Sequence, residues 1–80
     1  MATRRVRLKY PEALIKEPVL YRMVKQFDVL PNIRRARITD TEGEMVIELQ
    51  GSPEDLDQGI NYLQQEGVSV ESLEGDLLSP

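Results

Sequence analysis

Hydrophobic and polar residues alternate along residues 3–10, where Val6, Leu8 and Tyr10 fall on one face of an extended chain. Alternation with a period of two is typical of a half-buried β-strand. The pattern therefore predicts a first strand that ends at Pro11. The residues of its other face are basic: Arg5, Arg7 and Lys9.

A helical pattern follows Glu17 and Pro18, because proline is well tolerated in the first turn of a helix. The hydrophobic residues then recur at spacings of three and four, which is typical of a helix with one buried stripe. Residues 28–31 are expected to end this helix. The stripe consists of Leu20, Met23, Val24 and Phe27.

Two further strands, joined by a short hairpin, are predicted for residues 33–39 and 44–50. In the first, Ala36 and Ile38 alternate with Arg35 and Arg37. Gly43 comes late in the loop of residues 40–43, where a positive φ is often needed. In the second, the residues expected to face inward are Met45, Ile47 and Leu49.

A second helix has the clearest start signal in the sequence. Ser52 is expected as its N-cap and Pro53 as its first residue, with acidic residues behind them at the positive end of the helix dipole. Gly67 is well placed to end the helix. Residues 68–73 complete the pattern as a last strand, and residues 74–80 are expected to form a flexible tail.

The order of these elements, βαββαβ, predicts an α+β fold of the ferredoxin-like class. With right-handed crossovers, the expected sheet has four antiparallel strands in the order 4-1-3-2, with both helices on one face. Residues 1–73 are expected to form this single domain. Its predicted core is Val6, Leu8, Leu20, Val24, Phe27, Ile38, Met45, Ile47, Leu49, Leu56, Ile60 and Leu63.

Charge is distributed unevenly along the chain. All ten Lys and Arg residues lie in residues 1–40, whereas residues 41–80 hold ten of the fourteen acids. A basic nucleic-acid surface is one interpretation. In the predicted strand order, however, basic and acidic strands alternate, so that Arg5, Arg7 and Lys9 would neighbour Glu48 and Glu71. We therefore expect a self-paired sheet face, and no nucleic-acid partner, because the two central strands also lack outward aromatic residues for base stacking.

The residue types present argue against catalysis. Without Cys or His, the chain has no thiolate nucleophile, Ser-His-Asp triad or zinc-finger ligand set. The acids around Glu54 and around Glu42 suit a helix start and a turn, and neither group has calcium-loop spacing. We expect no enzyme activity, catalytic residue, metal, cofactor or membrane insertion. The absence of cysteine and of an apolar leader favours a cytoplasmic location.

Residues 17–73 resemble the NIL domain, a family named for an Asn-Ile-Leu motif. The similar features are Glu17 and Pro18 at the first helix, Asn32 and Ile33 at the second strand, and the segments 43–44 and 51–54. The resemblance implies a ferredoxin-like fold akin to ACT regulatory domains. NIL domains occur at the C-terminus of ATPase subunits of methionine ABC importers, where methionine inhibits transport, and also as stand-alone proteins, which this chain is similar to.

The resemblance also implies a ligand site at Asn32, Ile33 and Arg34. Asn32 could orient the amino or carboxylate group of a ligand, although asparagine also suits a strand entry after proline. Arg34 departs from the family motif, which has leucine at this place. It could remove an apolar wall, or pair with a ligand carboxylate in bidentate fashion.

The resulting hypothesis is a stand-alone regulatory domain that binds an amino acid, similar to methionine, at a homodimer interface. The alternative is an interaction module that dimerises or docks on a partner protein and binds no metabolite. A homodimer is expected through either the edge of the second strand or the open sheet face. Contacts between its arginines and acids of the second copy should weaken with salt.

Overall fold

The computed structural model describes residues 1–73, and the tail predicted for residues 74–80 lies outside the described residues. The order of strands and helices is the predicted one, and the α+β ferredoxin-like class is confirmed. The elements are β1 (Ala2–Tyr10), a 3-10 helix (Glu12–Leu14), α1 (Val19–Gln26), β2 (Leu30–Ile38), β3 (Gly43–Gly51), α2 (Pro53–Glu66) and β4 (Ser69–Ser72).

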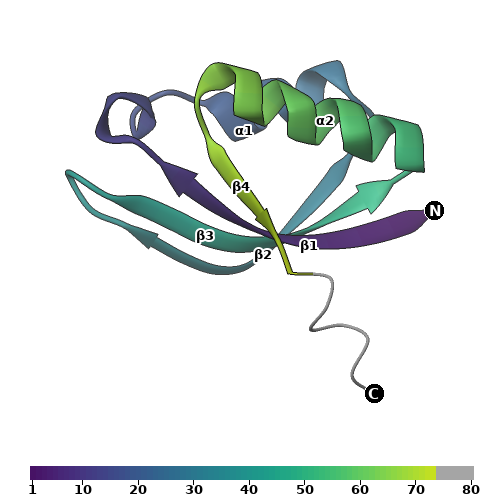
Figure 1. Ribbon diagram of the computed structural model, residues 1–80, viewed down its shortest axis with the longest axis horizontal. Helices are drawn as coiled ribbons and strands as arrows, with labels where there is room; N and C mark the ends of the chain where they lie inside the picture. The colour runs from purple at the N-terminus through teal and green to yellow at the C-terminus, as the bar shows by residue number, and fades with distance from the viewer. Residues whose placement is uncertain (74–80) are drawn as a thin grey trace.

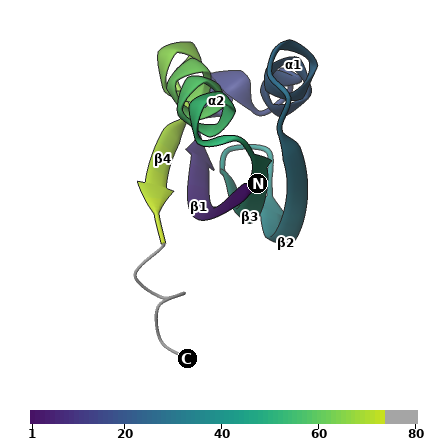
Figure 2. The same cartoon turned by 90° about the vertical axis from the view of Figure 1, so that its right-hand side faces the viewer.

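The four strands form one antiparallel sheet in the order β2-β3-β1-β4, as predicted. Both helices lie on the same side of this sheet (Figure 1). Figure 2 shows α2 above the β4 and β1 side and α1 toward the β2 side. The opposite face of the sheet is covered by no element of residues 1–73, and we call it the open face.

The core lies between the sheet and the two helices. Six of its buried residues were predicted, from Val6 to Leu63. The other four were not in the predicted core, although Met23 was assigned to the buried stripe of the first helix. Val19 lies outside that stripe, and Val29 and Val68 each follow the end of a helix and belong to no periodic pattern. The buried hydrophobic residues are Val6, Leu8, Val19, Met23, Val29, Ile47, Leu49, Leu56, Leu63 and Val68.

The prediction that Ile38 belongs to the core is wrong. Its side chain is 52% exposed, although it lies opposite Gly43 on the helix side of the sheet. The reason is its place on β2, which is an edge strand with no neighbour on its outer side. Alternation identified the face of Ile38 correctly, but it carries no information about whether that face is covered.

The hairpin between β2 and β3 also differs from the prediction. Gly43 is the first residue of β3 and does not have a positive φ. The turn is closed instead by Thr39, whose Oγ1 accepts a hydrogen bond from the Glu42 N–H at 2.9 Å. Gly43 is needed for space, because a Cβ there would lie 3.2 Å from the Cβ of Tyr10.

Two element boundaries in the first half of the chain differ from those predicted from the sequence. α1 begins at Val19, after a separate 3-10 helix that the pattern did not predict. β2 begins at Leu30, earlier than expected, because Leu30 and Pro31 pair with the end of β3. Proline is acceptable here since β2 is an edge strand.

Candidate functional site

β2 is the most exposed element of the fold. Every residue from Asn32 to Ile38 is exposed, including Ile33 at 51%. The pairing of β2 with β3 shifts between Ile33 and Arg35, which makes Arg34 the extra residue of a β-bulge. Bulges at sheet edges redirect a side chain, and here the redirected side chain is that of Arg34.

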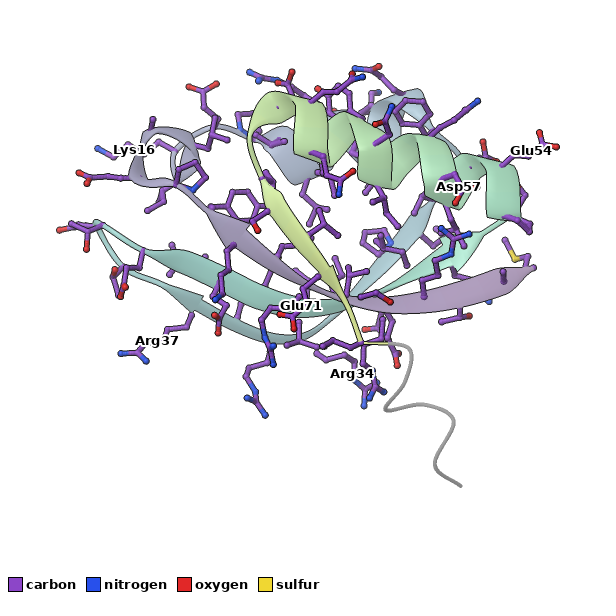
Figure 3. The ribbon with its side chains drawn as sticks, viewed as in Figure 1. Lys16, Arg34, Arg37, Glu54, Asp57 and Glu71 are labelled. Carbon is purple, nitrogen blue, oxygen red and sulfur yellow. The ribbon has the colours of Figure 1, made fainter. Side chains whose placement is uncertain are left out.

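The structure brings together two of the three predicted ligand residues. Asn32 lies opposite Glu48 and therefore on the open face, whereas Ile33 lies opposite the buried Ile47 and faces the helix side. The side chain of Arg34 also points to the open face (Figure 3). Asn32 and Arg34 thus share a face, and Ile33 is on the other side of the sheet.

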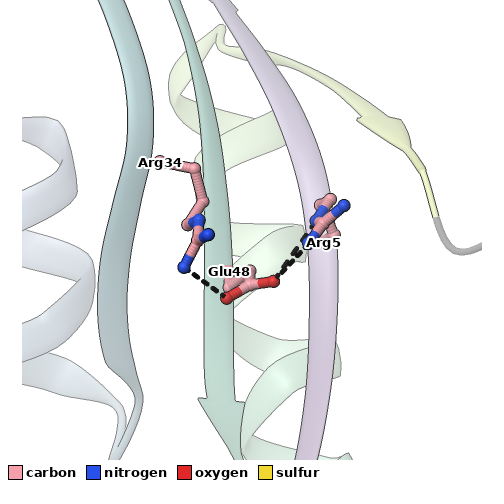
Figure 4. A network of polar contacts seen from close by, with 3 residues as sticks. All are labelled: Arg5, Arg34 and Glu48. Carbon is pink, nitrogen blue, oxygen red and sulfur yellow. Dashed lines mark hydrogen bonds and ion pairs between the residues drawn. The ribbon is translucent and has the colours of Figure 1, made fainter. Parts of the chain in front are cut away.

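Arg5, Glu48 and Arg34 form a polar network across three strands (Figure 4). Arg5 donates to Oε2 of Glu48 from Nη2 at 2.7 Å and from Nε at 3.3 Å. Arg34 lies farther away, with Nη1 3.7 Å from Oε1. The hydrogen bonds from Arg5, helped by the charge of Arg34, hold the pKa of the Glu48 carboxyl below its usual range, against a smaller opposing effect of burial.

Two further ion pairs lie on the open face, of which the pairing of a β1 arginine with Glu71 was predicted and that of Lys9 with Glu44 was not. Arg7 Nη1 lies 3.0 Å from Oε1 of Glu71, and Lys9 lies 4.0 Å from Glu44. Within residues 1–73, the guanidinium groups of Arg35 and Arg37 have no ion pair or hydrogen bond. The row of arginines along β2 is therefore only partly neutralised.

A shallow depression lies on the open face between β2 and β1. It has a volume of about 350 Å³ and is lined by four arginines and two apolar residues. The sequence offered no direct signal for it, since its residues come from four separate segments. The lining residues are Arg5, Arg7, Arg34, Arg35, Val46 and Leu73.

An apolar groove lies on the other side of the sheet, beside the start of α1. Its volume is about 210 Å³, and Ile38 and Tyr21 are among its exposed walls. Burial of Tyr10, which also lines the groove, raises the pKa of its phenol. Asn32 and Ile33 line neither this groove nor the arginine depression. The groove is lined by Tyr10, Ile15, Glu17, Pro18, Val19, Leu20, Tyr21, Ile38 and Met45.

Two further observations limit the chemistry of the described part of the chain. Residues 1–73 contain no group of three or more acids that could hold a metal ion together. Neither helix among them is long and apolar enough to cross a membrane. The open face and the groove together present guanidinium groups, the amide of Asn32 and apolar side chains, and groups of these kinds bind ligands.

Comparison with known proteins identifies the family. The model of the NIL domain family matches residues 4–72, and the chain belongs to this family. Its relatives include methionine import ATP-binding proteins. Those of Acinetobacter baylyi, 37% identical over 68 residues, and Coxiella burnetii, 32% identical over 72 residues, match 80% and 85% of this chain. The chain spans about a fifth of the length of these relatives, 20% of each.

A solved structure supports the fold independently. The C-terminal domain of an ABC transporter ATP-binding protein from Enterococcus faecalis superposes with a TM-score of 0.78. The similarity covers 88% of this chain and 82% of that domain, at 23% sequence identity. At this identity the likeness concerns the fold.

Proposed function

We propose that this chain is a regulatory domain that binds a small molecule, most simply an amino acid, at the seam between two copies. Methionine is the first amino acid to test, because the relatives are named as methionine import proteins. The proposal includes a cytoplasmic location, and it includes no catalytic role. Asn32 and Arg34 are the residues proposed to hold the ligand, with Ile33 at the dimer contact.

The observation that carries the proposal is the exposure of β2. Leu30, Ile33 and Ile38 are 58%, 51% and 52% exposed on an edge strand. Free edges with apolar residues invite pairing with another chain, and pairing of two β2 strands would extend the sheet across a two-fold axis. Asn32 lies in neither depression of a single copy, so a second copy is needed to enclose a ligand beside it.

The response of the dimer to salt concentration distinguishes the two interfaces that the sequence allows, the β2 edge and the open sheet face. The charged residues of β2 on the open face are Arg34, Arg35 and Arg37, all basic. In a dimer joined at β2, arginines of the two copies would adjoin, so moderate salt should strengthen it by screening their repulsion. For this edge, that response replaces the expectation from the sequence that salt weakens the dimer. A dimer packed through the open faces would instead match arginines with acids, and salt should weaken it.

The alternative function is an interaction module that docks on a partner protein and binds no metabolite. The apolar groove beside Tyr21 and Ile38 favours it, since groups of exposed apolar side chains are common at protein contacts. This candidate needs no contribution from Asn32. The role of Asn32 in ligand binding therefore separates the two functions.

A thermal-shift screen against the amino acids, on the protein and on Asn32→Ala, tests the proposal. A ligand at a hundred times its dissociation constant should stabilise the protein by about 2.7 kcal/mol. We expect methionine or a similar amino acid to raise the melting temperature, and Asn32→Ala to reduce that shift. If no amino acid changes the melting temperature, the metabolite-binding proposal is wrong and the interaction module remains.

A further inference from the structure

The open face carries a positive charge that the whole chain does not have. The register of the four strands places six basic and three acidic residues on this face, while the net charge of the chain is −4. The other acidic residues therefore lie outside the open face, as Glu54 and Asp57 do on α2 (Figure 3). The nine charged residues are Arg5, Arg7, Lys9, Arg34, Arg35, Arg37, Glu44, Glu48 and Glu71.

The excess is concentrated in the arginine depression. Four guanidinium groups line it, and two carboxylates, those of Glu48 and Glu71, contact them from outside its lining. Arg35 has no ion pair within residues 1–73. Arg34 is 54% exposed and lies 3.7 Å from Glu48, beyond hydrogen-bond distance. Arg35 can consequently turn toward a ligand without breaking an ion pair, and Arg34 would give up only its long ion pair with Glu48.

We propose that this depression binds the phosphoryl group of a small metabolite. A phosphate monoester carries a charge of about −1.5 to −2 at neutral pH, which matches the two positive charges left unneutralised there. Guanidinium groups bind phosphate oxygens in pairs through parallel hydrogen bonds. A single carboxylate would neutralise only one of the two charges.

The neighbours of the arginines set the geometry of this site. Arg5 is fixed by its two hydrogen bonds to Glu48, and Arg7 by Glu71, so these two guanidiniums supply a positive field from held positions. Arg34 and Arg35 supply the mobile donors. Val46 on β3 lies between Arg7 of β1 and Arg35 of β2, and it adds an apolar wall for the remainder of the metabolite. A volume of about 350 Å³ is at the small end of the range for ligand sites.

This site goes beyond the proposed amino-acid function. It shares Arg34 with the proposed amino-acid site, but all of its lining residues belong to one copy of the chain, and Asn32 is not among them. Asn32→Ala should therefore leave phosphoryl binding unchanged. Loss of the amino-acid response without loss of phosphoryl binding, or the reverse, would show which of the two proposals has failed.

Isothermal titration with methyl phosphate, a simple phosphate monoester, at low salt tests the site on the intact chain. We expect saturable binding at one site per chain, and Arg35→Gln should weaken it about tenfold, the equivalent of one charge-assisted hydrogen bond. Arg37→Gln is the matched control, because it removes the same charge from the same strand and face but outside the depression. Its binding should stay within about twofold of the unmodified protein.

Three results would overturn the proposal. The first is an absence of saturable binding, and the second is an equal loss in Arg37→Gln, which would indicate a diffuse charge effect. The third is equally tight binding of succinate, a dicarboxylate of similar charge, which would show that the phosphoryl group is not recognised. Amide shifts of the unmodified protein during the titration, expected to be largest at residues 34, 35 and 46, keep the test decisive if Arg35→Gln does not fold.

Discussion

Arg5 and Glu48 lie opposite each other on neighbouring strands and are joined by two hydrogen bonds, at 2.7 and 3.3 Å, to a single carboxylate oxygen. The same carboxylate faces Arg34 on β2 with its other oxygen. Glu48 thus connects the central strand pair with the exposed edge. This connection offsets part of the positive charge of the three arginines that β2 carries on the open face.

The Glu48 carboxyl predicts a specific response to acid. Its pKa is lowered in the folded protein, chiefly by the hydrogen bonds from Arg5. A carboxyl whose pKa is lowered by folding contributes stability at pH values above its pKa in the unfolded chain, about 4.3. This contribution is lost as the pH falls through its pKa in the folded protein. Urea unfolding between pH 7 and pH 3 should therefore show a smaller acid loss for Glu48→Gln than for the unmodified protein. Identical acid losses would contradict the role of this carboxyl, and Glu44→Gln is the control.

The raised pKa of the Tyr10 phenol predicts a loss of stability at alkaline pH. Burial raises its pKa in the folded protein, so the neutral form is favoured by folding. The corresponding stability is complete below the unfolded pKa, about 10, and is lost as the pH rises toward the folded pKa. Unfolding at pH 8 and pH 11 should show that Tyr10→Phe removes part of the alkaline loss. Tyr21→Phe, at a residue that is 62% exposed, is the matched control for loss of a phenol.

The ends of α2 should be sensitive to single changes. Ser52 Oγ accepts a hydrogen bond from the Asp55 N–H at 3.0 Å, so Ser52→Ala should cost about 1 kcal/mol. Gly67 has φ 107, and a Cβ there would lie 3.2 Å from Leu14. Gly67→Ala should therefore cost about 1–3 kcal/mol. Chemical denaturation measures both, and a neutral Gly67→Ala would contradict the observed cap.

Two apolar residues with the same expected role should differ in their importance. Leu56 is fully buried, and Leu56→Ala should lower the free energy of unfolding by about 2–5 kcal/mol. Ile38 is half exposed, and Ile38→Ala should cost about 1 kcal/mol or less in a monomer. Denaturation at low protein concentration compares them. Equal costs would mean that β2 is covered in the isolated chain.

The dimer itself can be tested at the edge of β2. Ile33→Lys places a charge on the apolar side of the edge strand, where Ile33 is 51% exposed. We expect the dimer to dissociate while the melting temperature measured at low concentration stays nearly unchanged, because no buried contact is lost. Ser69→Lys, at an exposed position of β4, the opposite edge strand, is a suitable control for added charge. A dimer unaffected by Ile33→Lys would exclude the β2 edge as the interface.

The sequence predicted the sheet order and the pairing of Arg5 with Glu48 because both follow from local patterns, whereas the contact of Arg34 with Glu48 was not predicted. Alternation assigned Arg5 and Glu48 to the open face, and the order of elements made β1 and β3 neighbours. Coverage is a tertiary property, however, and for that reason the exposure of Ile38 was missed. The bulge at Arg34 was also beyond reach, since a single extra residue in a strand leaves no periodic signal. Asn32 and Ile33 were singled out by resemblance, and the structure assigns them to opposite faces.

Sedimentation equilibrium of the purified chain, with and without methionine and at two salt concentrations, tests the central claim most directly. We predict a reversible dimer that moderate salt strengthens, that added methionine tightens, and that Asn32→Ala no longer tightens. The salt response identifies the β2 edge, and the methionine response identifies the seam as the ligand site. A chain that stays monomeric at high concentration in both salts, whichever amino acid is added, would contradict the dimer and the ligand site together.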